Sequence, residues 1–173
     1  YDIGANIGQC AILAAKAGMR VYAFEPHPDS FRTLFQNIRL NRIAITPINC
    51  LVSDKNGILA FDIGTKWSGS CAFDNRTSRK KIVSTLSTTL NSFHTFFGLP
   101  RPEYLKIDTD GYELQIIENS DMSSVRELSI EISDEKKHGE VQRILISKGF
   151  VRFDEEYLLK DKKYPMNEFW KRK

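Results

Sequence analysis

The sequence predicts an α/β fold, with a doubly wound, mostly parallel sheet flanked by helices and an antiparallel pair of strands near the C-terminus. Short apolar runs that suit buried strands alternate with segments whose apolar residues recur every three or four positions, as in buried helices. A glycine-rich turn joins the first strand signal to the first helix signal. Since the chain has 173 residues, we expect one domain over 1–173.

In the N-terminal part, strand and helix signals follow one another closely. Residues 1–3 end a strand, and 7–18 has the apolar spacing of a buried helix that ends at Gly18. The short apolar run 21–24 predicts a buried parallel strand. A helix over 28–40 follows, because Pro is favoured in a first helical turn and the apolar residues keep helical spacing.

The middle of the chain gives weaker signals. A strand is expected over 43–52, although Pro47 interrupts it, and another over 58–63 after a turn. Segment 64–81 is polar and basic, so we expect a solvated loop; attraction of an anionic acceptor is the alternative. The remaining elements expected in this region are a strand over 82–85 and a helix over 90–97.

The C-terminal part again alternates strands and helices. The apolar strand 104–107 leads into an acidic loop that contains Asp108, Asp110 and Gly111. The last four residues, 170–173, are interpreted as a small basic tail with one aromatic residue, and membrane-surface contact is the alternative. The other expected elements are helices over 113–118 and 139–148 and strands over 128–132, 150–153 and 157–159.

Composition excludes several classes of protein. Hydrophobic residues make up 41% and charged residues 27%, the balance of a globular rather than a disordered chain, and no apolar run is long enough to span a membrane. The net charge of +3 is too small to require a nucleic-acid partner. Cys10, Cys50 and Cys71 are odd in number and form no CxxC, so neither a disulfide framework nor a zinc ribbon is expected. A reducing, cytoplasmic compartment follows.

The start of the chain leads to a further expectation. Only Tyr1 precedes the loop motif, whereas a strand that feeds such a loop normally has several apolar residues before it. We therefore expect the N-terminal portion of the domain, including most of its first strand, to be missing. An upstream targeting segment stays an open alternative.

The strongest local motif is the loop YDIGANIG at 1–8. Gly4 and Gly8 permit a tight turn and the close approach of a ligand, and the helix that follows offers free N–H groups. Asn6 replaces the second glycine of the dinucleotide fingerprint, which favours a ligand without a phosphate. Glu25 follows Gly4 by 21 residues, at the end of the next strand, where a carboxylate can accept hydrogen bonds from ribose hydroxyls. The alternative is a pair of turn glycines with a helix-capping carboxylate.

Four segments together resemble the FkbM-type family of class I methyltransferases, which use S-adenosylmethionine (SAM) and have a Rossmann-like fold. The segments are DIGANIG at 2–8, VYAFEPHPDSFRTLFQNIRLN at 21–41, YLKIDTDGYELQIIEN at 104–119 and LSIEI at 128–132. The resemblance implies SAM as the cofactor. It places Glu25 at the ribose hydroxyls and Asp108 where the methyl donor and acceptor meet. The other residues that it places at the cofactor are Asp2, Gly4, Asn6, Gly8, Pro26, His27, Ser53 and Asp54.

Two positions depart from the pattern of the family. Asp110 stands where members usually have Glu, which keeps the charge but shortens the side chain. Asn91 stands where members usually have Asp, which removes a charge at an expected helix start, where Asn still caps.

Several carboxylates fall where the chemistry is expected. Asp108 is the first candidate for a general base or acceptor-orienting residue and Asp110 the second, while Glu113 and Glu131 also fall at the expected C-terminal strand ends. The alternative is that Asp108 only binds the cofactor or caps the Gly111 turn. Lys106 is interpreted as a surface residue or a salt-bridge partner, and no role is assigned to it. A Mg²⁺ site built from Asp108, Asp110 and Glu131 is the alternative to the metal-free site that we expect.

The function predicted on this basis is methyl transfer from SAM to a hydroxyl of a sugar, polysaccharide or secondary metabolite. One alternative is a nicotinamide-dependent oxidoreductase, which the absence of GxGxxG and the EPHP segment after the strand disfavour. The others are an RNA methyltransferase, which the modest charge disfavours, and a module that binds SAM without catalysis.

Overall fold

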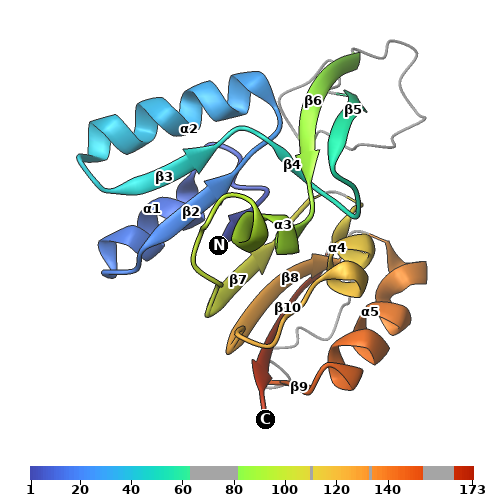
Figure 1. The fold of residues 1–173 in the computed structure, drawn as a ribbon. Helices are drawn as coiled ribbons and strands as arrows, with labels where there is room; N and C mark the ends of the chain where they lie inside the picture. Colours follow the sequence, from blue (N-terminus) through green and yellow to red (C-terminus); the bar gives the residue numbers. More distant parts are fainter. Residues whose placement is uncertain (63–81, 110, 133, 154–165) are drawn as a thin grey trace.

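A seven-stranded sheet forms the centre of the computed structural model, which describes residues 1–62, 82–109, 111–132, 134–153 and 166–173 (Figure 1). The strand order is β3-β2-β1-β7-β8-β10-β9. The first five of these are parallel to one another, whereas β10 runs antiparallel to both β8 and β9. The strands are β1 (Asp2–Ile3), β2 (Val21–Phe24), β3 (Ile45–Ile48), β7 (Tyr104–Ile107), β8 (Glu127–Ile132), β9 (Phe150–Arg152) and β10 (Met166–Arg172).

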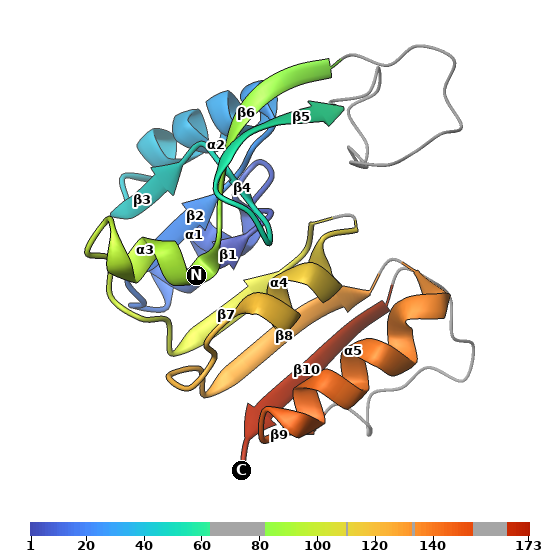
Figure 2. The ribbon, with the colours of Figure 1, turned by 45° about the vertical axis from the view of Figure 1, so that its right-hand side comes forward.

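Helices lie on both faces of this sheet. On one face, Ala11 of α1 (Gln9–Lys16) and Leu34 of α2 (Pro28–Asn41) pack with Val21 and Ala23 of β2. On the other face, α3 (Leu90–Thr95), α4 (Glu113–Asn119) and α5 (Glu135–Ser147) pack on a larger core that reaches from β2 to β10. Figure 2 shows α4 and α5 side by side over β8 and β10. The predicted architecture is therefore confirmed.

A smaller sheet follows β3 in the chain. It has the order β4-β6-β5, with β4 (Leu51–Val52) parallel to β6 (Ile82–Thr88) and β5 (Gly57–Asp62) antiparallel to it. The strand expected over 43–52 was wrong as one element, because β3 and β4 belong to different sheets. Pro47 lies in β3, at an edge of the large sheet, where a missing N–H is tolerated. The loop expected over 64–81 lies outside the described residues.

The C-terminal tail is where the sequence-based prediction failed most clearly. Residues 170–173 are not a free basic tail, because Met166–Arg172 forms β10, and Trp170 is 2% exposed. The antiparallel pair at the C-terminus is thus β9 with β10. The strand expected over 157–159 lies outside the described residues. Helix α5 also begins earlier than expected, since the Asp134 side chain accepts a hydrogen bond from the Lys136 N–H and caps it.

The two halves of the large sheet differ in how they are covered. Strand β2 is buried on both faces, whereas β8 alternates buried and partly exposed residues along its length. A groove of about 620 Å³ opens beside α1 on the face of β7, β8 and β10 that is opposite α4 and α5, and Tyr104 and Phe169 line it.

Among the described residues, no helix is both long and apolar enough to cross a membrane.

Candidate active site

The ends of β1, β2 and β7 bring the predicted site residues together. The chain runs from β1 outward to β2 and β3 on one side, and β7 pairs with β1 on the other. In parallel sheets, ligands bind at this point of reversal, outside the carboxyl ends of the strands. We call the loops 4–8 and 25–27, together with 108–109 and 111–113, the strand-end site.

The glycine loop is shaped by close contact with the protein itself. A Cβ atom at Gly4, whose φ is +77°, would lie 1.6 Å from the Asp108 carbonyl oxygen. A Cβ atom at Gly8, whose φ is +93°, would lie 2.5 Å from Cδ1 of Leu34. Both positions therefore require glycine in order to seat this loop against the loop after β7 and against α2. The sequence predicted a tight turn that a ligand approaches closely. In this structure, the atoms that approach the two glycines belong to Asp108 and Leu34 of the protein itself.

Glu25 lies at the end of β2 and faces this loop. Its Oε2 accepts a hydrogen bond from the Asn6 N–H at 2.7 Å, and its Oε1 accepts one from the His27 N–H at 2.8 Å. Burial raises the pKa of Glu25 to about 7, although these two hydrogen bonds oppose the shift. A carboxylate has about four acceptor positions, so Glu25 keeps capacity for further donors such as ribose hydroxyls.

Ion pairs of the Lys106 side chain connect β1 to the end of β7. The Lys106 ammonium lies 3.2 Å from Oδ1 of Asp2 and 3.0 Å from Oδ2 of Asp108. Asp2 is buried, and neither of its carboxylate oxygens forms a hydrogen bond within the described residues, so the Lys106 contact is an ion pair only. Asp108 is more accessible, with a side chain that is 33% exposed. The structure therefore brings Asp2 and Asp108 together around a lysine to which the sequence analysis assigned no role.

Glu113 holds the acidic loop after β7 in shape. Its buried carboxylate accepts hydrogen bonds from the Thr109 N–H, the Thr109 hydroxyl and the Gly111 N–H, at 2.9–3.1 Å. Lys137 of α5 donates to the Gly111 carbonyl at 3.3 Å. With its acceptors engaged inside the loop, Glu113 is a structural carboxylate rather than a candidate base. Asp110 lies outside the described residues.

The expected adenine-contacting residues differ in what they do. His27 is the N-cap of α2, and its Nδ1 accepts from the N–H groups of Asp29 and Ser30. Ser53 follows β4 and is buried, with its hydroxyl 2.8 Å from that of Ser87 in β6. This hydroxyl is thus used inside the small sheet. Pro26 and Asp54 are both half-buried, Pro26 between Glu25 and His27 and Asp54 directly after Ser53.

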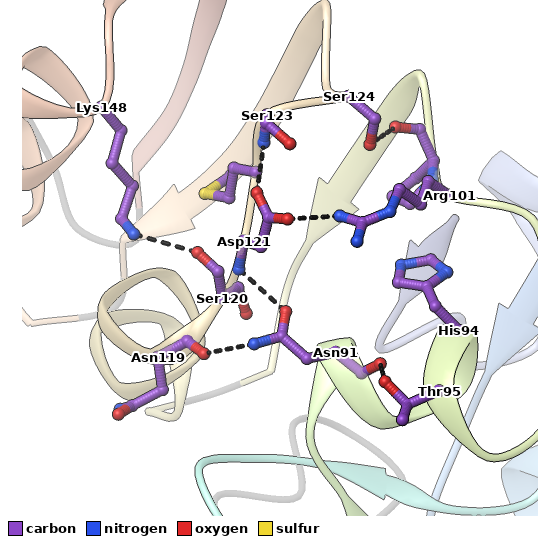
Figure 3. A network of polar contacts seen from close by, with 12 residues as sticks. Asn91, His94, Thr95, Arg101, Asn119, Ser120, Asp121, Ser123, Ser124 and Lys148 are labelled. Carbon is purple, nitrogen blue, oxygen red and sulfur yellow. Dashed lines mark hydrogen bonds and ion pairs between the residues drawn. The ribbon is translucent and has the colours of Figure 1, made fainter.

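Asn91, the second departure from the family pattern, has a structural explanation. Its Nδ2 donates to the Asn119 carbonyl and its Oδ1 accepts from the Asp121 N–H, so it bridges α3 and the end of α4 (Figure 3). A carboxylate would accept the second hydrogen bond but lacks the proton for the first. The N-cap of α3 is Thr89 rather than Asn91. Ser123 and Arg101 keep the pKa of the neighbouring Asp121 carboxyl well below its usual range.

No group of three potential metal ligands gathers in the part of the chain that the structure describes. Glu131 is the penultimate residue of β8, and the Asn167 amide lies 3.5 Å from one of its oxygens. The metal-free site stays a prediction, since Asp110 belongs to the proposed ligand set.

Comparison with known proteins assigns the family. The model of the methyltransferase FkbM domain matches residues 2–152. The chain belongs to this family. The predicted family and its cofactor, SAM, are thereby confirmed, and a nicotinamide-dependent oxidoreductase is excluded.

Two curated relatives are methyltransferases. The hexuronic acid methyltransferase AglP of Haloferax volcanii is 27% identical over 135 residues, which cover 76% of this chain and 54% of the relative. The 31-O-demethyl-FK506 methyltransferase FkbM of Streptomyces tacrolimicus is 27% identical over 190 residues, which cover 87% of this chain and 72% of the relative. The chain thus spans about half the length of AglP.

Solved structures confirm the fold. The precorrin-6y C5,15-methyltransferase of Geobacter metallireducens aligns with a TM-score of 0.53 at 14% identity, over 98% of this chain and 75% of its own. The ribosomal protein L11 methylase of Lactobacillus delbrueckii subsp. bulgaricus aligns with a TM-score of 0.51 at 17% identity, over 99% of this chain and 68% of its own.

The residues at the strand ends fit the cofactor of the family. Glu25 has acceptor capacity to spare, and the buried Asp2 carboxylate forms no hydrogen bond within the described residues, although its Oδ1 forms an ion pair with Lys106. Sequence analysis assigned no role to Lys106 and named Glu113 only as a carboxylate near the expected chemistry. For Lys106 the available signal was its position two residues before Asp108, because alternate residues of a strand share a face.

Proposed function

We propose that this methyltransferase domain transfers a methyl group from SAM to a hydroxyl oxygen of a sugar, polysaccharide or secondary metabolite. The observation that carries the proposal is the position of Asp108, which directly follows β7 and whose backbone lies against the glycine loop. The Asp108 backbone touches Gly4, and its side chain is the more accessible of the two carboxylates held by Lys106. An acceptor next to Asp108 would therefore also lie next to the cofactor loop.

The protein has a limited task in such a reaction. When bound, SAM supplies an electrophilic methyl group on a positively charged sulfur. Glu25 would hold the ribose hydroxyls, and Asp2, Gly4, Asn6 and Gly8 would surround the methionine and ribose. Pro26, Ser53 and Asp54 are the further cofactor residues in the proposal. Because the Ser53 hydroxyl already forms a hydrogen bond with Ser87, the backbone of residues 53–54 is the part that would contact adenine.

Asp108 would orient the acceptor hydroxyl or remove its proton. The ammonium of Lys106 contacts Oδ2 of Asp108. The other carboxylate oxygen, Oδ1, is the one that we assign to the acceptor. A general base of this kind must lie within hydrogen-bond reach of the proton that it removes. Asp110 is the second candidate for this role.

The relatives support the acceptor class. The name of one describes methylation of a hexuronic acid, and the name of the other describes methylation at an oxygen of demethylated FK506. Sugars and oxygenated secondary metabolites are therefore the first acceptors to test.

The test is transfer of a labelled methyl group from SAM by the full-length protein. The acceptor panel contains free hexuronic acids, glycans with and without them, and hydroxylated macrolides. Label in a base-stable ether would support O-methylation of a hydroxyl, whereas label lost in mild base would identify a carboxyl ester instead. SAM binding without transfer to any class would favour a binding module, and no SAM binding would contradict the proposal altogether.

A further inference from the structure

Lys106 lies where β7 pairs with β1, two of the three strands whose ends form the strand-end site. It pairs with Asp2 across the parallel ladder of β1 and β7, and Asp108 follows on the same face two residues later. Its ammonium reaches Oδ1 of Asp2 at 3.2 Å, Oδ2 of Asp108 at 3.0 Å and the Gly4 carbonyl at 3.4 Å. The ammonium thus lies close to three oxygens, one from β1, one from the loop after β1 and one from the loop after β7.

Lys106 supplies the positive charge that faces the carboxylates of Asp2 and Asp108. Two carboxylates approach one ammonium, and the side chains of Asp2 and Lys106 are only 7% and 22% exposed. Burial opposes the charge on Lys106, but Asp2 and Asp108 outweigh it and raise the pKa of the ammonium, so Lys106 stays charged at neutral pH. The other ionisable groups around it are Cys10 of α1 and Glu25 after β2.

The same contacts tie two loops together. The backbone of Asp108 already presses on Gly4, where a Cβ atom would not fit. Lys106 adds a contact from its side chain to the Gly4 carbonyl and another to the Asp108 carboxylate. A shift of the ammonium would therefore move the cofactor loop and the reactive carboxylate relative to each other.

We propose that Lys106 is a positioning residue for methyl transfer, because its ammonium fixes the Asp108 carboxylate against the glycine loop and balances the buried charge of Asp2. This inference rests on the proposed function. Lys106 acts on the reaction through Asp108 and is not itself a group that touches the acceptor.

A purely structural role would leave a different signature. If Lys106 served only to neutralise Asp2, its loss would destabilise the fold and leave the rate per folded molecule intact. If it positions Asp108, the rate falls even where the fold is restored. The two roles are separated by removing the Asp2 charge together with Lys106.

The experiment compares kcat and SAM affinity for three variants of the full-length protein. Lys106→Met removes the charge at similar length, Lys106→Arg keeps the charge in another shape, and Asp2→Asn/Lys106→Met removes both buried charges. Lys16→Met, an exposed lysine at the end of α1, is the matched control. We expect kcat of Lys106→Met to fall about 10²-fold, as small misplacements of reacting groups do, while SAM affinity changes by less than about threefold. Lys106→Arg should recover part of the rate, and the double variant should regain stability but remain slow.

Several results would overturn the proposal. A folded Lys106→Met protein within about twofold of the wild-type kcat would show that Asp108 does not need the ammonium. A double variant that recovers the full rate would reduce Lys106 to a partner of Asp2. Equal losses of kcat and SAM affinity would make it a cofactor-binding residue. Failure of the proposed function looks different, because wild-type protein would then bind or transfer nothing from SAM.

Discussion

Two buried glutamates, at opposite ends of the sheet, show how a site differs from a structural network. Glu25, after β2, is 6% exposed and accepts one backbone N–H on each oxygen. Glu168, in β10, is fully buried, and its Oε1 contacts His138 at 2.6 Å and Arg152 at 2.7 Å. Gln142 donates to the same oxygen and the Trp170 N–H to Oε2. We call this second group the Glu168 network.

Both glutamates are buried, so burial does not distinguish them. What distinguishes Glu25, at the candidate site, from Glu168 is that its carboxylate keeps unused hydrogen-bond acceptor capacity. Arg152 supplies a cation to Glu168, whereas Glu25 has only neutral donors and a raised pKa. A buried carboxylate without a full set of donors costs free energy unless a ligand supplies them. The predictions below test this difference, starting with the largest expected effect.

Asp108→Asn should have the largest effect, on rate. The amide keeps the shape but removes the charge, so kcat should fall about 10²–10⁴-fold, the usual contribution of a general base. SAM affinity should change much less, because the role lies in the transition state. Methyl-transfer rate and calorimetric affinity are measured on the same protein, with Asp29→Asn on α2 as the control. A rate close to wild type would show that Asp108 is neither base nor orienter, and parallel losses would make it a cofactor ligand.

Glu168→Ala should have the next largest effect, on stability. It removes the carboxylate that balances Arg152 in the core and should lower the free energy of unfolding by about 3–5 kcal/mol. SAM affinity of the folded fraction should be unchanged. Urea unfolding checks this, with the exposed Glu140→Ala in α5 as the control, which should stay within about 0.5 kcal/mol. A loss of SAM affinity in folded Glu168→Ala would erase the contrast between the two glutamates.

Glu25→Ala should weaken SAM binding by about 1–3 kcal/mol, because a buried ribose would lose a charged hydrogen-bond partner. Its effect on unfolding should be smaller than that of Glu168→Ala, since Glu25 carries a cost of burial in the free protein. Titration calorimetry measures the affinity, and the exposed Glu118→Ala serves as control. Unchanged affinity in a folded Glu25→Ala protein would mean that Glu25 does not hold the ribose.

The raised pKa of Glu25 predicts two opposite pH trends. Its native pKa of about 7 exceeds the ordinary 4.5, so the native state binds the proton more tightly, and this contribution to stability falls as pH rises from about 4.5 to 7. Ribose hydroxyls favour the ionised carboxylate, so SAM affinity should instead rise as pH increases through about 7. Calorimetry between about pH 6 and 8 measures SAM affinity, and Glu25→Gln should remove the part of its pH dependence that comes from Glu25. A wild-type profile that matches Glu25→Gln would remove Glu25 from the binding step.

Chelation should have the smallest effect. We expect methyl transfer to be unaffected by EDTA, because Lys106 already supplies a cation to Asp108. Turnover is compared before EDTA, after EDTA and after added Mg²⁺. Clear loss followed by rescue would contradict the metal-free site and return Asp108, Asp110 and Glu131 to the role of ligands.

How far the sequence could predict the structure also differs between the two ends of the sheet. The apolar run of β2 indicated a strand buried on both faces, and its burial confirms this. Strand β10 was missed, although its buried and exposed residues alternate with the period of a strand. Its charged residues suggested a solvated tail, because partners such as His138 and Arg152 are not visible in the local pattern.

The sequence by itself determined the family, the alternation of strands and helices in the N-terminal part up to β3, and the carboxylates that follow β2 and β7. These follow from local signals, namely hydrophobic period, glycine in tight turns and short spacings. Only the tertiary structure decided that Lys106 joins Asp2 to Asp108, that the Asp108 carbonyl is what fills the space beside Gly4, and that Glu168 is neutralised in the core. Asp2 meets Lys106 through the register of two parallel strands that are far apart in the chain, and such a register is set by packing of the whole sheet.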